Sequence, residues 1–293
     1  MKLKFWLLGI IVLLTFGAVF YLLRWQRLHS PITEETRQRA LSGVETNVDW
    51  APLVREKDGF LMMLVPAGCF EMGTSEAQLQ VAEASCKAYF GNSECRQDFS
   101  IEQPSFTACL AEPYWIDRTE VTNAQYGSDS RVDSRFPRKD PDWPREAVTW
   151  EMAAEFCEQR GGRLPTEAEW EFAARGPDAT IYPFGDDYDI QRVTLRKISP
   201  PLVGEHPEGA SWVGAQDMSG GVAEWVLDWF GPYSSAQVSD PEGPDEGQLR
   251  IAKGGGWFAH AAYQVRSAIR EPYNVEYASS SVGFRCALDF ESP

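Results

Sequence analysis

RLPTEAEWEFAARG, at Arg163–Gly176, is the stretch that decides the fold. Thr166 is a candidate N-cap, and Glu169 three residues later completes a capping box, so a helix should begin just after Thr166. The closing glycine supplies a stop. Directly upstream, AVTWEMAAEFCEQRGG (Ala147–Gly162) predicts another helix, capped by Thr149 and ended by two glycines. Two individually capped helices therefore follow each other in the middle of the chain.

Around these helices the regular patterns are short. FLMMLVPAGCFEMG (Phe60–Gly73) predicts two strands separated by a Pro-Ala-Gly turn, and VAEASCKAYF (Val81–Phe90) predicts a short helix. EPYWIDRTEVTNAQY (Glu112–Tyr126) runs from a strand into a helix with Thr122 as its candidate N-cap. Beyond these elements the chain is mostly glycine- and tryptophan-containing turns. Such a fold must be held by side chains, cross-links or ions.

Composition excludes two broad classes of protein. The 293 residues include 43 acidic and 27 basic side chains, a formal net charge of −16, which argues against non-specific binding to nucleic acid. Hydrophobic residues make up 43% of the chain, with 11 tryptophans, so global disorder is excluded. We therefore expect a packed, acidic body with no nucleic-acid partner.

The N-terminus carries a 19-residue run without charge, Phe5–Leu23. As a helix it would span roughly 28 Å, about the thickness of a bilayer's hydrocarbon core. Lysines precede it, Arg24 follows it, and no small-x-small cleavage site is visible, which favours an uncleaved signal anchor over a cleavable signal peptide.

We predict four regions. They are a cytoplasmic N-terminus (1–4), a transmembrane anchor (5–23), a polar spacer (24–58) that includes a surface helix capped by Thr33, and one globular domain (59–293). The six cysteines fit three disulfides if the body faces an oxidising compartment. The predicted location is a single-pass protein of the bacterial inner membrane, with its body in the periplasm.

The order of the motifs resembles that of the formylglycine-generating enzyme, or sulfatase-modifying factor, domain family. The resemblance covers about Phe60 to Leu288. The matching stretches are VPAGCFEMG, EVTNAQY, RLPTEAEWEFAARG, DMSGGVAEWVLDW, RIAKGGGW, RSAIR and GFRCA. The resemblance implies an α+β fold that is irregular, turn-rich and related to C-type lectins.

The family's oxidase binds copper through two cysteines located between GGSW and R-x-x-x-R. Here that segment is GGGWFAHAAYQVRSAIR (Gly254–Arg270), which contains no cysteine, and Gly256 stands where the motif has serine. Cu(I) requires soft thiolate ligands, so we expect no copper and no formylglycine generation. The segment predicts a degenerate member, and whether it is an enzyme of another kind stays open, with a non-catalytic protein favoured.

The resemblance also implies a calcium site and one disulfide. The calcium ligands would be the carboxylates of Asp217 and Glu224 and the carbonyls of Gly220 and Val222. The alternative is that Asp217 caps a turn and Glu224 pairs with an arginine.

The family disulfide would join Cys157 to Cys286. Cys69 and Cys109 lie on segments that pair as neighbouring strands in the family, which suggests a second disulfide. Cys86 and Cys95 lie nine residues apart around a sequence that can turn back, so we pair them as the third. Free buried thiols are the alternative.

The favoured function is a membrane-anchored, non-catalytic binding or regulatory protein, acting on a protein partner in an envelope machine such as a secretion system. The former substrate cleft would then hold the partner through its aromatic, polar and basic side chains. These are Trp257, Phe258, His260, Tyr263, Gln264, Arg266 and Arg270. The alternatives are that the two arginines are structural, that the protein is an oxidoreductase with altered site residues of the siderophore-maturation type, or that it is a lectin-like glycan binder.

Overall fold

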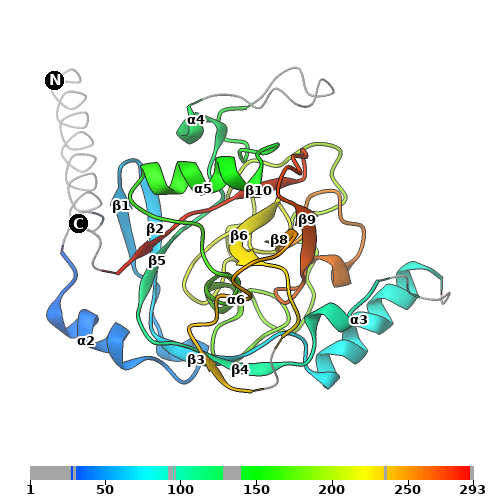
Figure 1. Cartoon of the computed structure of the whole chain (residues 1–293), viewed down its shortest axis with the longest axis horizontal. Helices are drawn as coiled ribbons and strands as arrows, with labels where there is room; N and C mark the ends of the chain where they lie inside the picture. The colour runs from blue at the N-terminus through cyan, green and yellow to red at the C-terminus, as the bar shows by residue number, and fades with distance from the viewer. Residues whose placement is uncertain are drawn as a thin grey trace, which may run out of the picture.

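The structure is a computed structural model that describes residue 28 and residues 31–91, 95, 97–127, 140–233 and 236–290 (Figure 1). The predicted anchor, residues 5–23, lies outside this range, so the structure does not test it. None of the helices within the range has the length and apolar character needed to cross a bilayer.

Three small sheets form the body. The first has the order β1-β2-β5-β11 and is antiparallel throughout. The second has the order β10-β6-β8-β9, with β10 parallel to β6. The third has the order β3-β4-β7, with β7 parallel to β4. The strands are β1 (Val54–Lys57), β2 (Phe60–Val65), β3 (Gly68–Met72), β4 (Phe106–Leu110), β5 (Tyr114–Asp117), β6 (Ala223–Trp229), β7 (Val238–Ser239), β8 (Leu249–Lys253), β9 (Glu271–Asn274), β10 (Val282–Phe284) and β11 (Ala287–Asp289).

Short helices fill the spaces between and around the sheets. The α-helices described are α2 (Glu34–Ser42), α3 (Glu76–Tyr89), α4 (Asn123–Tyr126), α5 (Trp150–Gln159) and α6 (Glu167–Arg175). The 3-10 turns are η1 (Asn47–Asp49), η2 (Ser100–Glu102), η3 (Pro207–Gly209) and η4 (Ala262–Val265). This mixture confirms the predicted α+β fold with little regular structure.

Helix α6 lies at the centre of the body (Figure 1). Its predicted capping box is present: Thr166 Oγ1 accepts from Glu169 N at 3.1 Å, and Glu169 Oε2 accepts from Thr166 N at 2.8 Å. All nine helical residues are buried, including Glu171 and Arg175. Burying charges on a helix requires partners for each of them, and the sheets and loops around α6 supply those partners.

The predicted spacer differs from what the structure shows. Ala40 of α2 and Trp50 are part of the main hydrophobic core, and Ala67 N donates to Ala40 O at 3.0 Å. Strand β1, also within the predicted spacer, pairs with β2. This region therefore packs on the body through single apolar residues, and it lacks the continuous apolar stripe by which a core segment is recognised.

The three expected disulfides are present. They join Cys69 to Cys109 across β3 and β4, Cys86 to Cys95 at the end of α3, and Cys157 of α5 to Cys286. The last of these closes a loop with a sequence separation of 129 residues. By loop entropy it should contribute about 5 kcal/mol.

Candidate functional site

The segment that carries cysteines in the family's oxidase begins directly after β8 and passes through η4. Gly255 has φ +68°, and a Cβ built on it would lie 2.1 Å from the carbonyl oxygen of Gln264. Glycine is thus required for the close approach of the two ends of this loop. The loop is consequently compact, and the side chains it carries point into the body or onto a neighbouring helix.

The aromatic residues of the predicted cleft are mostly turned inward. Trp257 is buried and its Nε1 donates to Ser280 O at 2.9 Å. Phe258 is half-buried and packs edge-to-face on Trp257, with ring centroids 6.1 Å apart. Tyr263 is buried and packs in the same manner on Phe99.

His260 is the exposed member of the predicted set. Its ring stacks on Tyr89 of α3, with centroids 6.1 Å apart and an interplanar angle of 7°. Gln264 caps η4, because its Oε1 accepts from the backbone N–H groups of His260, at 2.8 Å, and Ala261, at 3.1 Å. Gln264 therefore organises the loop, while His260 presents its ring at the surface.

The two arginines are in buried ion pairs. Arg266 meets Glu102 in a bidentate pair, with both N–O distances at 2.8 Å, and also donates to Thr74 Oγ1 at 3.2 Å. Arg270 meets Glu167 at 2.8 and 2.9 Å. Burial alone would lower the pKa of Arg270, but Glu167 beside it raises that pKa above its ordinary value.

Arg270 is further enclosed by carbonyls and rings. It donates to Ile101 O at 2.7 Å and Gly231 O at 3.0 Å, and its guanidinium lies 4.1 Å from the ring centroid of Tyr233. In a bidentate pair of this kind, the two parallel N–H groups of the guanidinium are already bonded and are not free to bind an external carboxylate. Both arginines are therefore structural cross-links. This is the alternative that the sequence left open, and it differs from the favoured prediction that they bind a partner.

Helix α3 covers the cysteine-free segment. Ala82 and Cys86 of α3 form one hydrophobic cluster with Ala261 and Tyr263, and Phe99 completes it. The disulfide from Cys86 fastens the end of this helix. All six cysteines are in disulfides. The segment that would carry the copper-binding cysteines therefore has no thiol and packs against α3.

The predicted calcium ligands lie in a buried acidic cluster. Glu224 is held by Arg285, at 2.5 and 2.7 Å, and by Trp170 Nε1 at 2.7 Å. Asp217 accepts from Gly204 N at 2.5 Å, and its pKa is raised to about 6, chiefly by burial.

Glu120 joins this cluster from the segment before α4. Its Oε1 accepts from Val222 N at 3.2 Å, and its Oε2 is buried without a hydrogen-bond partner. Burial, then Asp217 and Glu224, hold the pKa of Glu120 well above its usual range. We define the loop cluster as Glu120, Asp217, Glu224 and Arg285: three carboxyl groups facing one guanidinium.

A calcium ion fits this donor set only in part. The unpaired oxygen of Glu120 and the carboxylate of Asp217 are hard ligands in an electronegative place, as Ca²⁺ prefers. Glu224, in contrast, already has both oxygens bonded. Among the described residues, no three His, Cys, Asp or Glu side chains stand together as a metal site.

Sequence reasoning missed Glu120 as a site residue. It belongs to the EVTNAQY motif, but it meets Val222 across 102 residues of chain. The tight fit is visible at Gly221, where a Cβ would lie 2.3 Å from Glu120 Oε1. A glycine placed beside a distant acid gives no local pattern, so only the folded chain reveals the contact.

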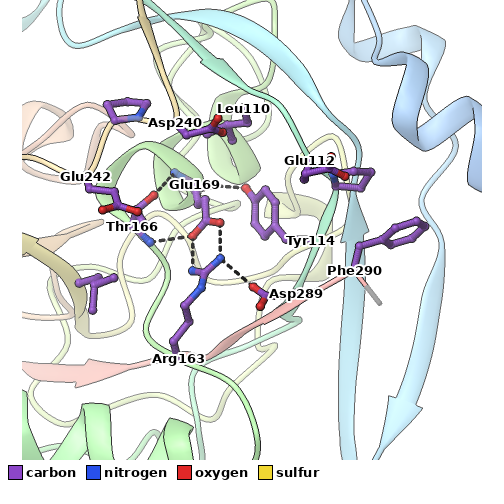
Figure 2. Close-up of a pocket in the computed structure, with 13 residues that line it drawn as sticks. Leu110, Glu112, Tyr114, Arg163, Thr166, Glu169, Asp240, Glu242, Asp289 and Phe290 are labelled. Atoms are coloured by element: carbon purple, nitrogen blue, oxygen red, sulfur yellow. Dashed lines mark hydrogen bonds and ion pairs between the residues drawn. The ribbon is translucent and has the colours of Figure 1, made fainter. Parts of the chain in front are cut away.

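A pocket of about 390 Å³ lies beside the start of α6, where Arg163 is the central polar residue (Figure 2). Arg163 donates to both oxygens of Glu169, at 2.6 and 2.7 Å, and to Asp289 at 3.2 Å. Tyr114 Oη donates to Glu169 O at 2.5 Å. These contacts tie α6 to β5 and β11, so we interpret the arginine as a structural link.

Fold and site together define an irregular, disulfide-linked α+β domain in which a cysteine-free segment packs against α3. A family model described as "Sulfatase-modifying factor enzyme 1-like domain" matches residues 52–290. The chain belongs to this family.

Two bovine proteins with different names are similar to this chain. The chain is 27% identical over 285 residues to "Formylglycine-generating enzyme" of Bos taurus, covering 78% of this chain and 74% of that protein. It is 30% identical over 167 residues to "Inactive C-alpha-formylglycine-generating enzyme 2" of Bos taurus, covering 51% of this chain and 52% of the relative.

A solved structure supports the fold. "Structure of PvdO from Pseudomonas aeruginosa" superposes with a TM-score of 0.63 at 23% identity, over 82% of this chain and all of that one. At this identity the likeness establishes the fold alone.

Proposed function

We propose that this protein is a non-catalytic binding module, anchored in the bacterial inner membrane by residues 5–23 and facing the periplasm, which acts through contact with another envelope protein. One observation carries the proposal: the segment Gly254–Arg270 has no cysteine and is covered by α3. One similar protein, "Inactive C-alpha-formylglycine-generating enzyme 2" of Bos taurus, is inactive by name. The three disulfides support an oxidising compartment.

The surface beside the covered cleft is the proposed contact surface. Tyr89 and His260 stack there, and Arg196 reaches across to donate from Nε to His260 O at 2.8 Å. Ile198, two residues further on, is 91% exposed. We define the contact surface as Tyr89, Arg196, Ile198 and His260. An exposed aliphatic residue beside aromatic and basic groups resembles the anchor residues of protein interfaces.

A capture experiment tests this surface. The tagged full chain would be purified from detergent-solubilised envelope as wild type, as H260A and as I198D. V48D is the matched control, because Val48 is 90% exposed and lies outside the contact surface. We expect a partner to co-purify with wild type and V48D and to be lost from I198D and H260A. Equal recovery with all four proteins would contradict the proposal.

A second experiment addresses catalysis. The purified chain would be supplied with Cu(I) and a cysteine-containing peptide, and formylglycine would be followed by mass spectrometry. We expect no product and no stoichiometric copper, because the site has no thiolate to bind a soft ion. Product formation, or a tightly bound iron or copper, would instead favour the oxidoreductase with altered site residues.

Membrane topology is tested separately. Protease added to spheroplasts should digest the body if it faces the periplasm and should leave it intact if it faces the cytoplasm. Digestion only after lysis would contradict the proposed location.

A calcium ion in the loop cluster is part of the same proposal. Asp217 and Glu120 would hold it through carboxylate oxygens, and the carbonyls of Gly220 and Val222 would complete it. The bound ion would neutralise buried negative charge and would take no part in a reaction.

A further inference from the structure

A second pocket lies on the far side of the body from the contact surface. It has a volume of about 410 Å³ and is bounded by α2, β1 and β5. In Figure 1, β1 and α3 lie at opposite sides of the molecule. Its lining residues are Pro31, Ile32, Thr33, Thr36, Pro52, Leu53, Val54, Arg55 and Trp115.

The lining contains no carboxylate. Each of the three other pockets compared has at least two acidic residues in its lining. In a chain with a net charge of −16, a pocket with an arginine and no acid stands apart. Apolar side chains and hydrogen-bond donors make up most of its wall.

Arg55 and Trp115 lie on one face of the first sheet. The register places Arg55 opposite Met62, and Trp115 opposite Leu64, two residues along the same strand. The Arg55 guanidinium lies 4.1 Å from the centroid of the Trp115 ring. This stacking fixes the plane of the guanidinium and helps to hold it inside the protein.

Both side chains keep unused donors. Nε and Nη2 of Arg55 and Nε1 of Trp115 are buried without a hydrogen-bond partner. Burial lowers the pKa of Arg55 to about 10, and no carboxylate of the described chain offsets that effect. A buried cation and a buried indole N–H are both costly when unpaired. Either group would be stabilised by an acceptor, and an anion would satisfy both.

We propose that this pocket binds the phosphate or carboxylate group of a small ligand, with Arg55 and Trp115 donating to the anion and Ile32, Pro52 and Leu53 contacting the ligand's apolar part. The guanidinium is one rigid fork of five N–H groups, so it can turn its donors towards an oxyanion as a unit. The pocket is large enough for an anion that bears one aromatic ring or a short acyl chain. This inference is independent of the proposed function.

Calorimetric titration of the full chain in neutral detergent tests the proposal. The compounds are phenyl phosphate, benzoate, inorganic phosphate and neutral benzyl alcohol. We expect phenyl phosphate and benzoate to bind, inorganic phosphate to bind more weakly, and benzyl alcohol not to bind. Dihexanoyl phosphatidic acid, used below its micelle concentration, distinguishes the source: tighter binding than phenyl phosphate indicates a lipid, and weaker binding indicates a soluble anion.

Variants locate the binding to this pocket. R55M should weaken phenyl phosphate binding by about 10-fold or more, since hydrogen bonds to charged groups are the strong ones. W115F should weaken it by about 3-fold through loss of the indole N–H. R192M is the matched control, because Arg192 also lies over a ring, that of Phe184 at 5.5 Å, but has an acidic partner in Asp189.

Two results would overturn the proposal. One is that no anion binds the wild type below about 10 mM, or that benzyl alcohol binds as well as benzoate. The other is that R55M and W115F both bind phenyl phosphate like the wild type. If R55M does not fold, as judged by circular dichroism, R55K and W115F carry the test. R55K keeps the charge but lacks the planar fork that stacks on Trp115, so it should weaken phenyl phosphate binding by about 3-fold or more, and binding equal to the wild type would count against the proposal.

Discussion

Glu171 and Glu120 are both fully buried glutamates, yet their pKa values move in opposite directions. Burial raises the pKa of each. At Glu171, Lys253 and Arg175 outweigh burial and bring the pKa below its ordinary value. At Glu120, the neighbours Asp217 and Glu224 add to burial, and Arg285 does not compensate. Burial therefore does not decide what a charged residue does; the balance of its neighbours does.

The same contrast extends to the two clusters. We define the α6 network as Glu167, Glu171, Arg175, Lys253 and Arg270, in which two carboxylates meet three cations. The loop cluster has three carboxyl groups and one cation. The first arrangement is self-sufficient and holds the helix in place. The second has an excess of negative charge, which is a reason for it to take up a proton or a metal ion.

The largest expected effect comes from breaking the α6 network. R270M removes the bidentate partner of Glu167 and leaves that carboxylate buried with a neutral donor, Tyr233 Oη at 2.8 Å, and a longer contact to Lys253 at 3.5 Å. We expect a loss of about 3–5 kcal/mol in the free energy of unfolding, measured with urea. K87M is the control: its pair with Glu83 is exposed, and its loss should cost less than about 0.5 kcal/mol. Similar losses of stability in R270M and K87M would show that the buried network contributes no more than an exposed ion pair.

Calcium should affect the loop cluster alone. At a calcium concentration of about 100 times its dissociation constant, the wild type should gain roughly 2.7 kcal/mol of stability. D217N and E120Q should lose this gain, whereas R270M should keep it at its own lower baseline. If calcium stabilised D217N as much as it stabilises the wild type, the loop cluster would not be the calcium site.

For each pH unit, a smaller effect is expected from Asp228, which lies at the edge of the α6 network and accepts from Glu167 N at 2.6 Å. Burial, followed by Glu167, raises its pKa to about 8, against about 3.9 in an unfolded chain. Between these values the folded state holds a proton that the unfolded state has released. Stability due to this group is thus fully present below about pH 4 and falls by about 1.4 kcal/mol per pH unit as the pH rises towards 8.

D228N tests the direction of that slope. The amide keeps an oxygen for Glu167 N but cannot ionise, so the variant should decline less steeply between pH 5 and 8. Unfolding curves at several pH values would show it. A steeper decline in D228N than in the wild type would mean that Asp228 is ionised in the folded state.

The contact surface should contribute least to stability. H260A removes an exposed ring that stacks on the half-exposed Tyr89. We expect a change of less than about 0.5 kcal/mol in the free energy of unfolding. A loss of several kcal/mol would make His260 structural and would weaken its assignment to partner binding.

Local chemistry made the helix starts predictable. The caps at Thr122, Thr149 and Thr166 depend on residues within one turn, and all three are present in the structure. Helix α3 begins earlier than its apolar pattern indicated, at a capping box formed by Ser75 and Gln78. Its apolar contacts are widely spaced, so its first turn gave a weak periodic signal.

The partners of the site residues could not be predicted in this manner. Arg266 meets Glu102 across 164 residues, and Arg270 meets Glu167 across 103. Glu102 lies in a short 3-10 turn, and Glu167 lies in the first turn of α6, where an acid is expected for the helix dipole alone. The resemblance predicted Cys157–Cys286 because the family preserves that pairing, and nothing comparable pointed to the two ion pairs. Long-range pairing depends on topology, which single-sequence patterns do not encode.

Because β10 and β11 are synthesised after the rest of the body, they determine when the chain can complete its fold. β10 completes the second sheet beside β6, and β11 completes the first beside β5, while Arg285 and Cys286 between them reach the loop cluster and α5. Until residues 282–289 have left the ribosome, both sheets keep an open edge, Glu224 lacks its guanidinium and Cys157 its partner. Native folding of this body therefore waits for residues 282–289, and a nascent chain stopped near residue 280 should stay protease-sensitive however long it is held there.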